Sequence, residues 1–180
     1  MKMTRTRWAS GIAVLLALTT SACGMNAAGG GVPGGGGHVV YAEQFSPGAA
    51  WAPETDDAHR LRRAGCLETL LSVGYDGELE PMLATEWEQV EPTTWEFTLR
   101  EGVTFQDGTP MDAEAVVGSL NHLLGVEAPA RAFNPDLIEK VSATDDSTVQ
   151  ITTPKPDALV PLRVASVNTG ILAPKAFEGD

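Results

Sequence analysis

Histidine, cysteine and acidic side chains are the groups in this 180-residue chain that could coordinate a metal or attack a substrate. His38, His59 and His122 lie too far apart in sequence to show the short spacing of metal ligands on one element. Neither the serines nor the two cysteines occur in a pattern that pairs a nucleophile with a histidine and an acid. The sequence therefore predicts neither a metal site nor a cofactor, and it predicts a protein that is not an enzyme. The alternative that would make it an enzyme is a lipid-anchored hydrolase.

Carboxylates are common enough in this chain to form close pairs by chance. Asp and Glu total 24 against 12 Lys and Arg, which gives a formal net charge of −12. We therefore expect the pairs Glu86/Glu88 and Asp145/Asp146 to be surface charges rather than an acid and a base. The same net charge excludes nucleic acid as a partner, because phosphates need a basic surface, and it disfavours direct adhesion to anionic lipid.

The first 23 residues have the pattern of an export signal. Lys2, Arg5 and Arg7 precede an apolar run at 11–18, and small residues then lead to Cys23. The run is about ten residues long, whereas a helix that spans a bilayer needs about twenty, so a cleaved signal is expected. Small residues before a lone cysteine resemble a lipobox, which makes Cys23 the predicted site of lipid attachment. An ordinary cleavage site beside an incidental cysteine is the alternative.

Residues 24–37 are dominated by glycine. This composition disfavours a fixed fold, because glycine loses more backbone freedom on ordering than any other residue. We predict a flexible tether that holds a globular body away from the membrane surface.

Alternating apolar residues predict β-strands in the middle of the chain. Trp95, Phe97 and Leu99 alternate with polar residues, which is the period of a half-buried strand. Residues 85–90 should pair with this strand through a turn at 91–93. Further strands are expected at 38–43, 138–143, 148–152 and 170–173.

Helical patterns alternate with these strands. Asp112 occupies an N-cap position before an apolar stripe, and Gly125 is expected to end the helix that follows. Cys66 lies within an earlier helical pattern and is expected to be a small buried group. Strands and helices separated by short turns indicate a mixed α/β class. The expected helices run from Asp56–Asp57 to about Ser72, from 112 to 125 and over 156–163.

Three consecutive segments resemble a single protein family. They are LEPMLATEWE at 79–88, FTLREGVTFQDGTP at 97–110 and MDAEAVVGSLNHLL at 111–124. In this order and spacing they resemble the large bacterial solute-binding proteins of ABC transporters that capture peptides, dipeptides or nickel, the oligopeptide-binding class or family 5. The resemblance covers residues 39–180 and is most specific at 79–124.

The resemblance implies an α/β fold of the periplasmic-binding-protein-like class II, present incompletely. Residues 38–180 are then expected to be the N-terminal part of the solute-binding domain, with first-lobe strands and an accessory α/β subdomain at about 50–165. Family members close two lobes around a ligand, so the resemblance implies that a second lobe is needed for tight binding. The aromatic residues of the accessory subdomain are expected in its core rather than around a ligand; they are Trp87, Trp95, Phe97 and Phe105.

The resemblance also implies a function. The expected protein is an extracytoplasmic solute-binding lipoprotein of an ABC importer, anchored to a bacterial cell membrane, which captures peptides or a related small solute for a membrane permease. The implied ligand-binding residues are Gln44, Phe45 and Ser46, in the loop after the first expected strand. The alternative is a truncated exported lipoprotein that acts as a protein-interaction module without transport.

Overall fold

This computed structural model describes Val40 and residues 42–177. The predicted export signal (1–23) and the predicted tether (24–37) lie outside the described part of the chain. The structure describes three positions of the strand expected at 38–43. None of them belongs to a strand, so the prediction is wrong there. A strand needs a hydrogen-bonded neighbour, and no strand within the described residues pairs with them.

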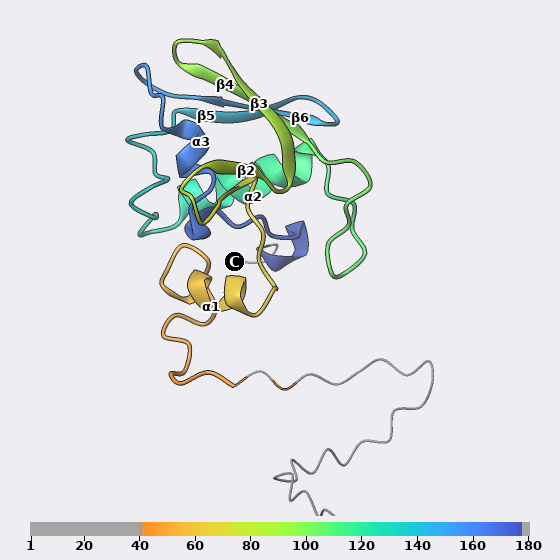
Figure 1. Ribbon diagram of the computed structural model, residues 1–180, viewed down its shortest axis with the longest axis vertical. Coiled ribbons are helices and arrows are strands. Elements are labelled where there is room, and N and C mark those ends of the chain that lie inside the picture. Colours follow the sequence, from red (N-terminus) through yellow and green to blue (C-terminus); the bar gives the residue numbers. More distant parts are fainter. Residues whose placement is uncertain (1–39, 41, 178–180) are drawn as a thin grey trace, which may run out of the picture. The chain divides into compact units, whose positions relative to one another are not determined.

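A four-stranded antiparallel sheet lies at the top of the described chain in the view of Figure 1. The strands lie in the order β3-β4-β6-β5, so the hairpins β3–β4 and β5–β6 meet along β4 and β6. The alternating pattern around Phe97 predicted the first hairpin, and the structure confirms it. The structure also confirms both strands of the second hairpin, with β5 shifted by two residues. The strand bounds are β3 Ala84–Glu91, β4 Thr94–Leu99, β5 Lys140–Asp145 and β6 Thr148–Thr152.

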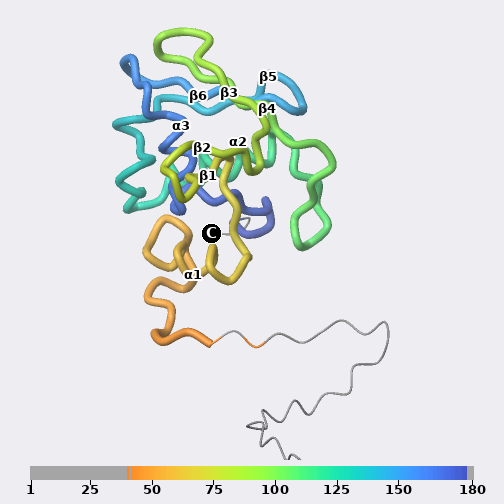
Figure 2. The backbone as a smooth tube through the Cα atoms, in the orientation of Figure 1, coloured from red at the N-terminus to blue at the C-terminus, as the bar shows by residue number. Residues whose placement is uncertain are grey.

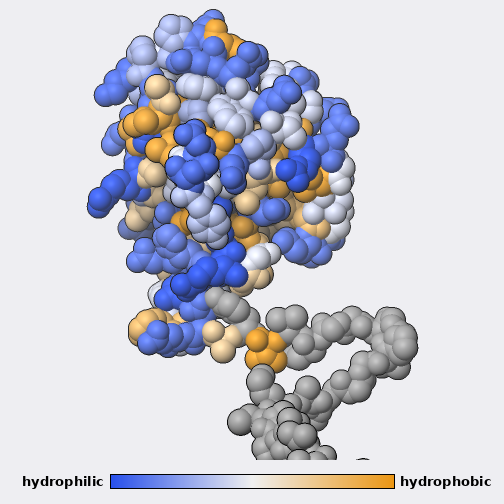
Figure 3. All heavy atoms as spheres, in the orientation of Figure 1, coloured by the Kyte–Doolittle hydropathy of each residue, from blue (hydrophilic) through white to orange (hydrophobic). Residues whose placement is uncertain are grey.

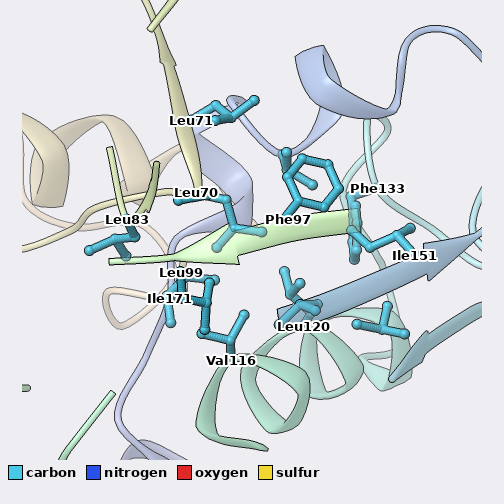
Figure 4. Close-up of a cluster of buried hydrophobic side chains, with 14 of the residues drawn as sticks. Leu70, Leu71, Leu83, Phe97, Leu99, Val116, Leu120, Phe133, Ile151 and Ile171 are labelled. Atoms are coloured by element: carbon cyan, nitrogen blue, oxygen red, sulfur yellow. The ribbon is translucent and has the colours of Figure 1, made fainter. Parts of the chain in front are cut away.

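One face of this sheet carries a row of apolar side chains across all four strands. Phe97 pairs with Trp87 on β3 and with Val149 on β6, and Val149 pairs with Ala143 on β5. Paired residues point to the same face of a sheet, so these four side chains are neighbours. Phe97 and Val149 are fully buried. Figure 4 shows Phe97 and Leu120 among the buried side chains of this core.

Helix α2, Ala113–Gly125, packs against strands β5 and β6 and supplies the facing apolar stripe. Val116, Leu120 and Leu123 from this stripe are buried. The Asp112 carboxylate accepts a hydrogen bond from the Ala115 N–H at 2.9 Å, so the predicted N-cap is confirmed. The predicted end of the helix at Gly125 is confirmed as well.

The first helix ends earlier than its apolar pattern predicted. Helix α1 spans Asp57–Arg63 and does not reach Ser72. Gly65 adopts a φ of +73°, and the Cys66 N–H bonds back to the Leu61 carbonyl at 2.9 Å. This is a glycine-dependent helix termination in which a left-handed residue turns the chain away. Cys66 therefore lies beyond the helix and is exposed, which contradicts the expectation that it is buried.

A second, two-stranded sheet follows this helix. Its strands are β1, Leu71–Val73, and β2, Leu79–Pro81, which pair antiparallel. β1 and the hairpin turn after it occupy part of the sequence predicted to be helix and turn. Tyr75 in that turn is fully exposed.

The last described part of the chain contains three short helical turns. Helix α3 begins at Val160, four residues later than predicted, and the strand expected at 170–173 is absent from the structure there. Ile171 makes a single backbone bond, from its N–H to the Glu68 carbonyl at 2.9 Å, instead of a strand ladder. The bounds are α3 Val160–Arg163, η1 Val167–Thr169 and η2 Pro174–Ala176.

The surface of the described residues is mainly polar. Hydrophilic side chains cover most of the described surface in the view of Figure 3. Within this part of the chain, every helix is too short or too polar to cross a lipid bilayer.

Candidate functional site

The predicted ligand loop, Gln44, Phe45 and Ser46, is exposed to solvent. The Phe45 ring is 64% exposed although it is apolar. Ser46 lines a surface hollow of about 300 Å³ together with Gly48 and Asp57. The loop therefore offers one apolar ring and two polar side chains at an accessible surface, and its ligand-binding role stays a prediction.

The Asp57 carboxylate organises the chain directly after this loop. Asp57 is only 2% exposed, and its oxygens accept hydrogen bonds from the N–H groups of Gly48, Ala49 and Trp51 at 3.0, 2.8 and 3.2 Å. The Arg60 guanidinium forms an ion pair with the same carboxylate at 2.5 Å. These bonds, led by the one from Ala49, lower the pKa of Asp57 below its ordinary value of 3.8, against the opposing effect of desolvation.

The backbone held by Asp57 is strained. Ala50 and Trp51 have φ angles of +52° and +69°, in the left-handed region that residues other than glycine rarely adopt. Such a conformation costs on the order of 1 kcal/mol or more for each residue. The Trp51 side chain is 43% exposed, so packing of the ring holds this turn only in part. The hydrogen bonds to Asp57 oppose the strain, together with the bond from the Ala52 N–H to the Ala49 carbonyl at 2.9 Å, which closes the turn.

A second polar contact holds the segment between this turn and α1. The Asn168 side-chain amide donates to the carbonyls of Pro53 and Thr55 at 3.0 and 2.8 Å. Asn168 belongs to η1, so the contact joins segments more than 110 residues apart in sequence. Figure 2 traces residues 42–56, in orange, as they loop beside α1. Sequence reasoning missed Asn168, because a single amide between helical turns carries no motif.

Sequence reasoning also missed the role of Asp57. It placed the start of the first helix at Asp56–Asp57, where both are plausible N-caps, yet neither side chain caps α1. Asp56 is exposed and Asp57 is buried. An Arg three residues after Asp57 was a weak signal for a paired buried acid, but burial itself depends on how the 48–51 turn folds back.

The sheet aromatics pack as predicted. Phe97 is fully buried, and Trp87, Trp95 and Phe105 are half-buried against the same core. The Trp95 indole N–H donates to the Asp157 carbonyl at 2.9 Å, which satisfies the one polar group of that ring inside the protein. These contacts confirm the interpretation of the aromatics as interior packing.

The outer face of the sheet has a shallow acidic hollow of about 390 Å³. Glu86 and Glu88 from β3 and Glu96 from β4 surround it, and the half-buried Trp87 also lines it. Glu88 lies directly opposite Glu96. Because strand residues alternate between faces, these acids lie on the side opposite Phe97. Glu86 and Glu88 are exposed, which agrees with the prediction that they are surface charges.

The other acids and histidines have structural roles or lie in solvent. Asp145 accepts hydrogen bonds from the Ser147 N–H and hydroxyl in the β5–β6 turn, and these bonds, the N–H first, lower the pKa of Asp145. His59 is exposed, and His122 stacks on Phe177 with ring centroids 4.9 Å apart. Among the residues that the structure describes, no three His, Cys, Asp or Glu side chains are grouped to hold a metal ion. His38 lies outside them.

Residues 78–180 match the family described as bacterial extracellular solute-binding proteins, family 5, middle. This segment is more than half of the chain and contains the four-stranded sheet with α2. The chain belongs to this family. The fold is accordingly the mixed α/β fold of periplasmic-binding-protein-like structures, of which only a part is covered.

Curated proteins match this chain over 103 residues. The chain is 37% identical over 103 residues to the probable D,D-dipeptide-binding periplasmic protein DdpA of Escherichia coli, covering 56% of this chain and 20% of that protein. It is 32% identical over 103 residues to the HTH-type transcriptional regulator SgrR of E. coli, covering 57% of this chain and 17% of SgrR. The chain thus spans about a fifth of the length of these curated relatives.

A solved structure extends the likeness. The nickel ABC transporter structure from Bacillus halodurans is 34% identical, with a TM-score of 0.62, and the match covers 72% of this chain and 26% of that one. The family match itself begins at residue 78. It therefore includes the sheet and α2 but leaves out Gln44, Phe45 and Ser46.

Proposed function

We propose that this chain is an extracytoplasmic solute-binding lipoprotein of an ABC importer, which captures peptides or a related small solute for a membrane permease. The observation that carries the proposal is the family 5 match over residues 78–180. DdpA, a dipeptide-binding protein by its name, favours a peptide among the possible solutes. The relatives are named for binding or regulation, so the proposed role is non-enzymatic.

Family membership alone leaves two roles open, because the relatives include both a periplasmic binding protein and a transcriptional regulator. The N-terminal sequence favours the first role. Lys2, Arg5 and Arg7 before an apolar run have the pattern of an export signal, and Cys23 is the proposed lipid-attachment site. The net charge of −12 also opposes contact with nucleic acid.

The proposed mechanism is capture in a crevice between two α/β lobes, closure of the lobes around the solute, and docking of the closed form on the permease. Closure excludes water and lets polar groups of the protein satisfy the polar atoms of the ligand. In the described residues, the proposed contacts are Gln44, Phe45 and Ser46. The Phe45 ring would cover an apolar part of the solute, while its polar neighbours offer hydrogen bonds.

Calorimetric titration of the complete protein, with both lobes, tests this proposal. We expect trialanine to release or absorb heat on binding to the protein, and we expect the Phe45→Ala variant to bind it at least about tenfold more weakly, as loss of one buried aromatic contact implies. Tyr75→Ala is the matched control, because Tyr75 is also an exposed aromatic residue but lies in the β1–β2 turn. Binding of nickel chloride with no binding of any peptide would overturn the peptide assignment.

A further inference from the structure

We propose that Asp57 is a positioning residue for the solute-binding site: it fixes the 48–51 turn and thereby sets the place of the ligand loop at Gln44, Phe45 and Ser46. This inference rests on the proposed function. Asp57 itself is buried and need not touch the ligand. Its role is to hold backbone that the ligand loop depends on.

The hydrogen bonds of the Asp57 carboxylate show which part of the chain it holds in place. One oxygen accepts from the Gly48 N–H and the Arg60 guanidinium, and the other accepts from the N–H groups of Ala49 and Trp51. The backbone groups that bond to the carboxylate lie in the 48–51 turn rather than in α1, the helix to which Asp57 belongs. Burying a charged carboxylate is costly unless it is fully bonded, so this arrangement indicates a dedicated contact.

This contact holds the shape of the turn together with the bond from the Ala52 N–H to the Ala49 carbonyl at 2.9 Å. Ala50 and Trp51 both hold left-handed backbone angles without being glycine. Non-glycine residues leave that region when nothing opposes the change. Two of the three N–H groups bonded to Asp57 belong to Ala49 and Trp51, the residues on either side of Ala50. The carboxylate therefore bridges the strained peptides from both sides.

The connection from the turn to the ligand loop is short and stiff. Only Pro47 separates Ser46 from Gly48. The proline ring fixes its own φ and restricts the residue before it, so a shift of Gly48 is passed on to Ser46. Ser46 also lines the same hollow as Asp57 and Arg60. A movement of the 48–51 turn would thus also displace Gln44, Phe45 and Ser46.

The far side of the loop is also held. Glu43 and Arg63 form an ion pair at 2.7 Å, in which the Arg63 side chain is 62% exposed and the Glu43 side chain 17%. The loop at Gln44, Phe45 and Ser46 therefore lies between this pair and the turn bonded to Asp57.

Asp57→Asn tests the inference. An asparagine keeps the shape of the side chain but replaces one acceptor oxygen with an NH₂ donor. Each Asp57 oxygen accepts from two donors, so in either orientation of the amide its NH₂ group faces two donors and loses both hydrogen bonds. We expect the amides of Gly48, Ala49 and Trp51 to exchange with solvent at least about tenfold faster in this variant, while the Phe97 and Val149 amides in the sheet keep their protection. Asp56→Asn is the matched control, because it removes the same charge at an exposed side chain that makes no cap bond.

A titration with trialanine completes the experiment. At a temperature where all variants are folded, we expect Asp57→Asn to bind trialanine about tenfold more weakly and Asp56→Asn to bind like the wild type. Unchanged exchange of the three turn amides, or loss of protection throughout the sheet, would each overturn the positioning role. If the wild type binds no peptide, the proposed function fails, and the exchange rates still decide whether Asp57 fixes the turn.

Discussion

Replacing Phe97 with alanine is expected to lower the free energy of unfolding by about 3–5 kcal/mol. Phe97 is fully buried at the centre of the sheet, between Trp87 on β3 and Val149 on β6. The substitution removes the ring and leaves a cavity that strands held on both sides cannot close. Because small domains are stable by only about 5–15 kcal/mol, the loss should be large in a urea unfolding curve.

Phe45→Ala is the matched control for this substitution. The same ring is deleted, but Phe45 is 64% exposed, so we expect the free energy of unfolding to change by no more than about 0.5 kcal/mol. The pair of variants separates the aromatic residue that builds the fold from the one proposed to meet a ligand. Equal losses in the two variants would contradict that division.

Gly170→Ala is expected to lower the free energy of unfolding by about 1–3 kcal/mol, because the added methyl group overpacks the core. A Cβ at this position would lie 2.3 Å from Leu67 Cγ and 2.2 Å from Leu67 Cδ1. Leu67 is only 5% exposed and has little room to turn away. The backbone cannot separate easily either, because the neighbouring Ile171 N–H is bonded to the Glu68 carbonyl.

Gly125→Ala provides the control for the effect of a methyl group alone. Gly125 ends α2, and a Cβ there would meet open space. Alanine also restricts the unfolded chain, so we expect this variant to be as stable as the wild type or more stable by up to about 1 kcal/mol. A Gly170→Ala variant that unfolds at the same urea concentration as Gly125→Ala would show that Leu67 repacks freely.

Local patterns were enough to predict the central sheet and its covering helix. Trp95, Phe97 and Leu99 alternate with polar residues, which is the two-residue period of a strand. Asp112 marks the start of α2 because its carboxylate bonds to the N–H of a residue only three positions away. These signals succeed because they depend on neighbours in sequence. The same segments carried the family resemblance, which the match over residues 78–180 confirmed.

The errors arose where contacts distant in sequence decide the structure. Apolar spacing predicted that the first helix continues to Ser72, but a left-handed Gly65 ends it after Arg63. The apolar residues at 170–173 suggested a strand, yet they bury against Leu67 and α2 without a pairing strand. Likewise, the arginine three residues after Asp57 was too weak a local signal to distinguish the buried Asp57 from the exposed Asp56.

The central claim is that the solute binds this chain at Gln44, Phe45 and Ser46, while the aromatic residues of the sheet serve only as interior packing. Titration of the isotope-labelled chain with trialanine, followed by NMR, tests it directly, because chemical shifts report even weak binding residue by residue. We expect the amide signals of Gln44, Phe45 and Ser46 to move and the Trp87 and Trp95 indole signals to stay in place. Shifts concentrated at those two indoles, or at Glu86, Glu88 and Glu96 around the acidic hollow, would contradict the claim.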